Sequence, residues 1–327
     1  MGKQIKKIGV LTSGGDAPGM NAAIRAVVRS SLYYGVEAVG IYRGYEGMIE
    51  GDFEEMNVRS VNHILQKGGT ILKSARCLDF HEPKFREKAA LKLRENNIDA
   101  VVAIGGNGTF TGAKLLWEEH GIPVIGVPGT IDNDLHGSDF TIGFDTANNV
   151  VLESIDSIRN TAMSHNRLFF VEVMGRESGY IAACTGLASG AFGILIPEKE
   201  TSFEELVEKL DTGRKNGKTS SIVVVAEGNK WGGASEIKQM IKEKAPIYDP
   251  KVTILGHVQR GGIPTCFDRI LASRLGVAAV EALRDGKSGV MVGIIDNKVA
   301  YTSLDDAIQF KDHVDEEITR VADILSI

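Results

Sequence analysis

The sequence has little proline or cysteine, no long apolar run and no surplus of basic residues, and each shortage excludes a class of protein. Proline supplies 8 of the 327 residues and no Gly-X-Y period is present, so the chain is not collagen-like. The three cysteines, Cys77, Cys184 and Cys266, are far apart and odd in number, which indicates neither a disulfide framework nor a zinc site. No apolar run approaches the roughly 18 residues that a membrane span needs, and the N-terminal apolar stretch is too short for a signal peptide.

The charge balance is acidic, with 37 Lys and Arg against 43 Asp and Glu and a net charge of −6. No run of basic residues stands out, so a general nucleic-acid binder is excluded. We therefore expect a cytoplasmic protein that binds neither nucleic acid nor membrane.

Glycine is abundant instead, at 38 residues. Short runs rich in Val and Ile alternate with segments of helical periodicity, which is typical of an α/β protein with mainly parallel sheets. We expect two doubly wound α/β domains with the active site in the cleft between them. The predicted strands are Ile8–Leu11, Ala38–Tyr42, Ala100–Ile104, Pro123–Val127, Leu168–Val173, Phe192–Ile196, Ser221–Ala226, Val252–Leu255 and Val290–Ile295.

Four glycine-bearing turns directly follow predicted strands, at Thr12–Asp16, Gly105–Thr109, Pro128–Thr130 and Met174–Arg176. Such turns let backbone N–H groups face an anion at a helix N-terminus, although tight packing alone also selects glycine. The first turn is not a Walker A loop, because no Gly-Lys-Ser/Thr follows it. Three glycines within four residues at 105–108 favour phosphate binding over a plain turn.

The segment PGTIDND, residues 128–134, places two carboxylates around Asn133 at the end of a strand. One carboxylate can hold a cation while the other accepts a proton from an attacking hydroxyl, as phosphoryl transfer requires. The alternative is a turn rich in Asp and Asn that caps a helix.

Basic residues also stand at strand ends, at Arg167, Arg176 and the pair His257 and Arg260. An arginine fork matches a phosphate group bidentately, whereas a single surface arginine is usually a solvated charge. Several such groups at strand ends of an acidic protein indicate a local anion pocket.

Seven motifs together resemble the bacterial 6-phosphofructokinases in content and order. They are TSGGDAPGMNAAIR, KGGTILKSAR, PGTIDND, HNR, VEVMGR, LGHVQRGG and DRILASR. The resemblance covers essentially the whole chain. It implies transfer of the γ-phosphoryl group of Mg²⁺-bound ATP to the 1-hydroxyl of fructose 6-phosphate, in a homotetramer whose substrate and effector sites are shared between subunits.

The resemblance also assigns roles to residues. It implies an ATP domain of residues 1–143 and 258–308 and a sugar-phosphate domain of residues 144–257 and 309–327. The catalytic residues would be Asp132, as the base, with Thr130 and Arg176. ATP would contact Gly15, Arg76, Cys77, Gly106, Asn107, Gly108 and Thr109, and Mg²⁺ would contact Asn107 and Asp134. Fructose 6-phosphate would contact Thr130, Ile131, Asp132, Arg167, Met174, Gly175, Arg176, Glu227, Lys251, His257 and Arg260, with Arg167 and Lys251 reaching it from a neighbouring subunit.

Glycines at 108 and 129 distinguish the chain from pyrophosphate-dependent relatives, which carry Asp and Lys there, so the resemblance favours ATP as donor. Other positions depart from the family pattern. Asn107 replaces a magnesium-associated Asp, and Lys251 replaces an Arg, which removes a bidentate fork.

The effector site is also altered. Arg25, Arg29, Arg159 and Lys218 remain, but Phe192, Val58 and His63 replace Glu, Arg and Asp. We expect weak or absent regulation by ADP and phosphoenolpyruvate. Asn107 leaves open a weakly active or non-catalytic sugar-phosphate-binding paralogue. A nicotinamide- or lipid-kinase-like enzyme does not explain TIDND together with MGR and HVQR.

Overall fold

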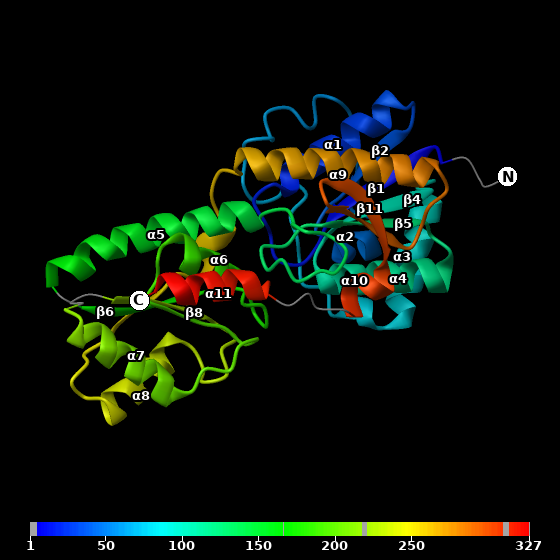
Figure 1. Cartoon of the computed structure of the whole chain (residues 1–327). Helices are drawn as coiled ribbons and strands as arrows, with labels where there is room; N and C mark the ends of the chain where they lie inside the picture. The colour runs from blue at the N-terminus through cyan, green and yellow to red at the C-terminus, as the bar shows by residue number, and fades with distance from the viewer. Residues whose placement is uncertain (1–4, 166, 218–220, 310–313, 327) are drawn as a thin grey trace. The chain divides into compact units, whose positions relative to one another are not determined.

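The computed structural model describes residues 5–165, 167–217, 221–309 and 314–326. Strands and helices alternate along the chain, which forms two compact units, each of α/β type (Figure 1). The larger unit comprises Met1–Ile131, Leu135–Thr146 and Arg260–Asp312, and the smaller one Asp132–Asp134, Ala147–Gln259 and His313–Ile327. The chain therefore enters each unit more than once.

The larger unit is built on a sheet whose described strands follow the order β11-β10-β5-β4-β1-β2-β3. The inner strands pair in parallel, and β3 and β11 pair antiparallel at the two edges. The strands are β1 (Lys7–Thr12), β2 (Glu37–Ile41), β3 (Phe53–Met56), β4 (Ala100–Gly105), β5 (Val124–Pro128), β10 (Val290–Ile295) and β11 (Lys298–Ser303).

Helices cover both faces of this sheet, which explains why all six residues of β4, AVVAIG, are buried. On one face α1 (Met20–Tyr33) and α9 (Cys266–Arg284) run side by side (Figure 1). A Cβ atom on Gly276 would lie 2.6 Å from the Cβ of Ala26, so glycine lets these helices approach closely. The other face carries α2 (Tyr45–Glu50), α3 (Pro83–Glu95), α4 (Asn107–His120) and α10 (Leu304–Gln309).

The smaller unit has a fully parallel sheet with the order β7-β8-β6-β9 among the residues described. One face packs on α7 and α8 through Phe170, Leu206, Val223 and Ile237, and α5, α6 and α11 lie on the other side (Figure 1). The strands are β6 (Leu168–Val173), β7 (Gly193–Leu195), β8 (Ser221–Ala226) and β9 (Lys251–Ile254). The helices are α5 (Phe144–His165), α6 (Tyr180–Ala188), α7 (Phe203–Lys215), α8 (Ala234–Lys244) and α11 (Glu316–Leu325).

The predicted fold class is confirmed, since both sheets are mainly parallel and helices alternate with strands. Each of the nine predicted strands overlaps an observed strand. The prediction missed β3 and β11, because Met56 is the only buried residue in these edge strands and neither carries a buried apolar run. A tight turn at Asp296 and Asn297, both with positive φ, joins β10 to β11. This Asp-Asn pair is the sequence signal that could have revealed β11.

No helix in the part of the chain that the structure describes has the length and apolar character needed to cross a bilayer. The cysteines Cys77, Cys184 and Cys266 are free thiols.

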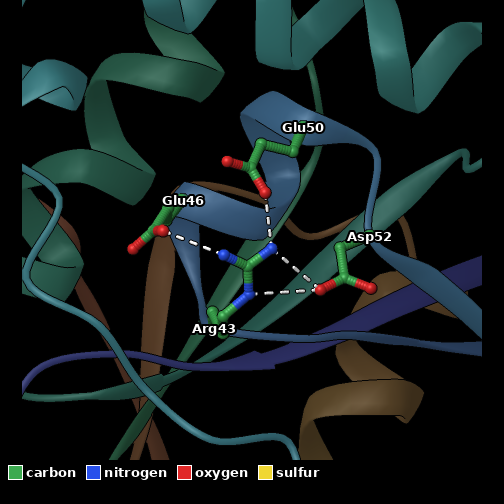
Figure 2. A network of polar contacts seen from close by, with 4 residues as sticks. All are labelled: Arg43, Glu46, Glu50 and Asp52. Atoms are coloured by element: carbon green, nitrogen blue, oxygen red, sulfur yellow. Dashed lines mark hydrogen bonds and ion pairs between the residues drawn. The ribbon is translucent and has the colours of Figure 1, made fainter.

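An arginine holds the short helix α2 in place (Figure 2). The Arg43 guanidinium donates to Glu46 (2.9 Å) and Glu50 on this helix and to Asp52 just after it (3.0 Å). A helix of six residues is not stable by itself, so contacts of this kind decide whether it forms. Arg43 also has a positive φ of 57°, which fixes the turn that leads into the helix.

We predict that Arg43→Gln lowers the thermal unfolding midpoint, because three carboxylates would then face one another without a cation. The deficit should shrink in about 1 M NaCl, where the Debye length is only about 3 Å. The matched control is Lys92→Gln, which breaks the exposed single pair with Glu95 and should change the midpoint little. Equal changes in the unfolding midpoint of the two variants, or a change in the Arg43→Gln variant that is the same at low and high salt, would contradict this interpretation. Differential scanning calorimetry at low and high salt measures both.

Candidate active site

Three glycine loops meet at the carboxyl edge of the larger sheet, because β1, β4 and β5 are neighbours and run parallel. The loops are joined by hydrogen bonds. The Ser13 N–H donates to the carbonyl of Ile104 (3.1 Å), the Thr109 hydroxyl donates to the carbonyl of Ser13 (3.1 Å), and the Gly129 N–H donates to the carbonyl of Gly105 (2.9 Å). The predicted glycine loops therefore form one continuous surface.

The second loop opens a helix, since α4 starts at Asn107 after Gly106. The first N–H groups of a helix point outward along its axis and bind anions. A Cβ atom on Gly105 would lie 2.3 Å from the Thr109 hydroxyl, so this glycine is required for the loop to close. A Cβ on Gly108 would meet nothing within 4 Å, and this position faces open space.

Gly129 is glycine for another reason. A Cβ atom there would lie 2.9 Å from Ile104 and 3.2 Å from Met20, both of which are fully buried. The side of Gly129 that a side chain would occupy is therefore the interior of the unit. Packing alone requires glycine at 129, whereas the space beside Gly108 is open to a ligand.

Tyr45 anchors the first turn of α4. Its hydroxyl donates to the carbonyl of Thr109, and its ring stacks on Phe80 with the centroids 4.0 Å apart. Burial raises the pKa of the Tyr45 hydroxyl, so it stays protonated and remains a donor. Gly112 leaves the room for this ring, because a Cβ there would lie 2.8 Å from it.

The segment before α3 lies beside the first loop. The Ser74 hydroxyl donates to the carbonyl of Gly14 (2.8 Å), and Thr12 bonds to Thr70 (2.8 Å). This brings Arg76 and Cys77, the former exposed and the latter half-buried, to the same edge as the glycine loops. Burial raises the pKa of the Cys77 thiol, which is therefore neutral rather than a nucleophile.

Arg260 lies against the first glycine loop. One of its guanidinium nitrogens donates to the carbonyl of Asp16 (3.1 Å), and a Cβ atom on Gly15 would lie 2.5 Å from the guanidinium. Because Gly15 has no side chain, it leaves the space that the Arg260 guanidinium occupies. The sequence predicts that Arg260 contacts the sugar phosphate. In the structure, Arg260 bonds to the predicted ATP loop of the larger unit.

The smaller unit has its own convergence of strand ends. Met174–Arg176 follow β6, Glu227 follows β8, and the turn at residues 256–259 follows β9, and these three strands are neighbours. The Glu227 carboxylate accepts the N–H of Arg176 (2.8 Å). The Gln259 side chain accepts the N–H of Met174 (3.1 Å) and donates to the carbonyl of Gly256 (3.0 Å).

The turn at Arg176 is strained in a way that its neighbours enforce. Gly175 and Arg176 have φ values of 138° and 55°, and positive φ is rare for a residue with a side chain. A Cβ atom on Gly228 would lie 1.8 Å from the carbonyl oxygen of Arg176, so only glycine fits there. The Arg176 side chain is exposed.

Asp132 is 5% exposed and belongs by its contacts to the smaller unit. The Ser178 hydroxyl donates to its carbonyl oxygen (2.8 Å), two residues after Arg176. The preceding residue Ile131 is fully buried, and the carbonyl of Thr130 accepts the Thr141 hydroxyl (2.7 Å). The backbone of TIDND is thus held at Thr130 and at Asp132, and Asn133 has a φ of 50°.

Two predicted substrate residues lie elsewhere. Arg167 directly precedes β6, and Lys251 begins β9, so both lie at the amino edge of the smaller sheet. Six strand residues span about 20 Å, which separates this edge from Met174 and Glu227 at the carboxyl edge. The Lys251 ammonium pairs with Asp249 (2.6 Å). Within one chain, therefore, Arg167 and Lys251 do not lie at the carboxyl edge of the smaller sheet. His257, by contrast, is exposed at this carboxyl edge.

The residues predicted for the effector site, retained and replaced, lie in different parts of the structure. Arg25 and Arg29 line a groove of about 330 Å³ beside α1 and α9, together with Tyr33, Tyr34 and Ser273. Burial and the charge of Arg29 lower the pKa of Arg25. Phe192 is 3% exposed in the core of the smaller unit, and Val58 and His63 are exposed. Arg159 donates to the carbonyl of Ser189, and Lys218 lies outside the described residues.

Among the described residues, no cluster of three or more His, Cys, Asp or Glu side chains could hold a metal ion unaided. Mg²⁺ commonly takes one or two protein oxygens and completes its shell with substrate phosphates and water. The amide oxygen of Asn107, at the start of α4, and the carboxylate of Asp134 are donors of this type. Each of the two can serve as one protein oxygen for a magnesium ion that arrives with a phosphate ligand.

Sequence reasoning missed the residues that hold these loops, namely Tyr45, Thr141, Ser178 and Gln259. Each is buried and bonds to a backbone group of another segment, which lies 11 residues away for Thr141 and 46 to 85 residues away for the other three. The only available signal was a polar residue inside or next to a recognised motif, as for Ser178 after MGR and Gln259 within HVQR.

Comparison with known proteins identifies the family. The family model described as Phosphofructokinase matches residues 7–283. The ATP-dependent 6-phosphofructokinase 1 of Thermus thermophilus is 54% identical over 99% of this chain and all of its own length, and that of Cytophaga hutchinsonii is 53% identical over 98% of both. The solved phosphofructokinase of Saccharomyces cerevisiae superposes with a TM-score of 0.88 at 36% identity over 98% of this chain, which spans about half of that longer chain (48%). The chain belongs to the phosphofructokinase family.

Proposed function

We propose that this protein is an ATP-dependent 6-phosphofructokinase, which transfers the γ-phosphoryl group of ATP to the 1-hydroxyl of fructose 6-phosphate in glycolysis. The observation that carries the proposal is the bond from the Ser178 hydroxyl to the carbonyl of Asp132. It fixes the proposed base next to the turn that presents Arg176, within one unit. A base and a phosphate-stabilising cation are the two protein groups that this reaction needs.

In the proposed reaction the Asp132 carboxylate accepts the proton of the sugar hydroxyl. The hydroxyl oxygen then bonds to the γ-phosphorus of ATP as the bond between this phosphorus and ADP breaks. Arg176 neutralises charge on the phosphoryl group in transfer, and the bond from its backbone N–H to Glu227 fixes the turn that carries it. Glu227 and Met174 line the sugar side, and His257 supplies a donor to the 6-phosphate.

ATP would bind the edge of the larger unit, where backbone N–H groups at Gly15 and at the start of α4 face the phosphates. When bound, Mg²⁺ would neutralise phosphate charge, held by Asn107 and Asp134. The open space beside Gly108 favours ATP over pyrophosphate as donor. Curated relatives at 50–54% identity are named ATP-dependent enzymes, and the reading as a non-catalytic paralogue is not favoured.

We also propose a homotetramer, in which Arg167 and Lys251 serve the site of a neighbouring subunit. Their place at the amino edge of the smaller sheet supports this, since they are remote from that sheet's carboxyl edge. Large apolar side chains are exposed on both units, at Ile254 and Val258 and at Ile263, Phe267 and Ile270. Exposed apolar groups of this size are commonly buried by association. The cytoplasmic location stays a prediction.

The function is tested by the formation of fructose 1,6-bisphosphate from fructose 6-phosphate with ATP and, separately, with pyrophosphate. We expect turnover with ATP only. Asp132→Asn should lower kcat by about 10²–10⁴-fold, because the amide cannot accept the proton. The control is Lys92→Gln on the surface of the larger unit, which should keep the wild-type kcat. Turnover with pyrophosphate alone, or an Asp132→Asn variant as active as the wild type, would refute the proposal.

Asn107 should make activity unusually dependent on magnesium. An amide oxygen ligates Mg²⁺ without supplying charge, so Asn107→Asp should raise kcat/KM at limiting Mg²⁺ by up to about 10²-fold. Asn107→Ala, which lacks any oxygen there, should lower it below the wild-type value. A magnesium titration of the three proteins measures this, and identical curves would exclude a metal contact at this position.

Effector regulation should be weak, because Phe192 is packed in the core of the smaller unit and offers no metal ligand. Phosphoenolpyruvate and ADP should leave the half-saturating concentration of fructose 6-phosphate unchanged in initial-rate measurements. Arg25→Ala, which removes a cation from the groove beside α1, should behave as the wild type. Inhibition by phosphoenolpyruvate that Arg25→Ala relieves would show a working effector site.

A further inference from the structure

The carboxylate of Asp268 is completely buried, and the activity described above gives it no role. It is the first residue of the motif DRILASR and lies in the first turn of α9, which Thr265 caps. A buried charge is strongly unfavourable unless hydrogen bonds satisfy it. The contacts of Asp268 therefore indicate what the residue is for.

Three donors from one short segment converge on this carboxylate. The Gly143 N–H donates to Oδ1 (2.8 Å), and the N–H and hydroxyl of Thr146 donate to Oδ2 (2.8 and 2.5 Å). Thr146 makes a further bond to the start of α9, because its hydroxyl accepts the N–H of Thr265 (3.1 Å). The carboxylate thus fastens the start of α9 to the segment 143–146.

That segment is in turn bonded to the end of β5, where the catalytic residues begin. The Ile142 N–H donates to the carbonyl of Pro128 (2.9 Å), and the Thr141 hydroxyl donates to the carbonyl of Thr130 (2.7 Å). Gly143 is therefore held by Asp268, while the two residues before it hold the strand that leads to Asp132.

The first glycine loop packs on the same point. A Cβ atom on Gly143 would lie 2.7 Å from Ala17, and one on Gly19 would lie 2.6 Å from Ile142 and 3.6 Å from the Cβ of Asp268. Both glycines are present because no space is left between the segments. Arg260, which precedes Thr265 in the chain, bonds to the carbonyl of Asp16, the residue next to Ala17.

We propose that Asp268 is a positioning residue for phosphoryl transfer, whose carboxylate holds the first glycine loop, the strand end at Thr130 and the Arg260 segment in one fixed arrangement. The proposal rests on the proposed kinase function. Burial and the charge of Asp145 raise the pKa of Asp268 to about 6, while its three donors favour the ionised form. The carboxyl is therefore ionised at neutral pH, as three donors require.

Asp268→Asn is the direct test, because the amide has nearly the same shape but must present an N–H group to Gly143 or to Thr146. One of the three bonds then becomes a contact between two donors. We expect kcat to fall by about 10- to 100-fold, the effect of a displacement of roughly 1 Å at a catalytic site, with the KM values for both substrates little changed. The matched control is Ser202→Ala, which removes the capping box of α7 and should lower the thermal midpoint without changing kcat.

A second pair of variants decides the question even if Asp268→Asn does not fold. Thr146→Val keeps the shape and removes the hydroxyl bonded to Asp268 and Thr265, whereas Thr146→Ser keeps that hydroxyl. We expect kcat to fall in the valine variant and to be restored in the serine variant. Equal kcat for these two variants, or a folded Asp268→Asn with wild-type kcat, would overturn the inference. An inactive wild type in the same assay would instead refute the proposed function.

Discussion

Parallel strand pairing is the constraint on which the rest of this structure depends. In a parallel sheet every strand ends at the same edge, so loops that are far apart in the sequence are brought together without any contact of their own. Here β1, β4 and β5 deliver Gly15, Asn107 and Thr130 to one edge, and β6, β8 and β9 deliver Arg176, Glu227 and His257 to another. Residues at the opposite ends of strands, such as Arg167 and Lys251, are left out for the same reason.

A strand end brings a loop to the right edge but does not fix its shape. In each loop a buried polar side chain does so, by bonding to a backbone group of the neighbouring segment. Tyr45 holds the start of α4, Ser178 holds Asp132, Gln259 holds Met174, and Asp268 holds the segment 143–146. The glycines fill the complementary role, since Gly15, Gly143 and Gly228 stand where a Cβ atom would collide with a neighbouring segment. The acidic chain can therefore present ordered N–H groups and arginines to anionic substrates.

The fold and the positions of the glycine loops could be predicted from the sequence because both follow from local patterns. Buried parallel strands read as short apolar runs, and glycine clusters mark the loops that follow them. The exposed edge strands β3 and β11 have neither signal. The supporting side chains could not be predicted because their partners lie far along the chain: 46 residues for Ser178, 64 for Tyr45, 85 for Gln259 and 125 for Asp268. The packing of Gly129 against Ile104 and Met20 was hidden for the same reason.

The proposed function assigns ATP to the sheet edge of the larger unit and fructose 6-phosphate to the sheet edge of the smaller unit. Hydrogen–deuterium exchange measured with one substrate at a time tests this division. Mg²⁺-ATP alone should slow exchange at residues 13–19 and 105–110, and fructose 6-phosphate alone should slow it at residues 174–178 and 256–259. Protection of the same segments by both ligands, or the reverse assignment, would contradict the account.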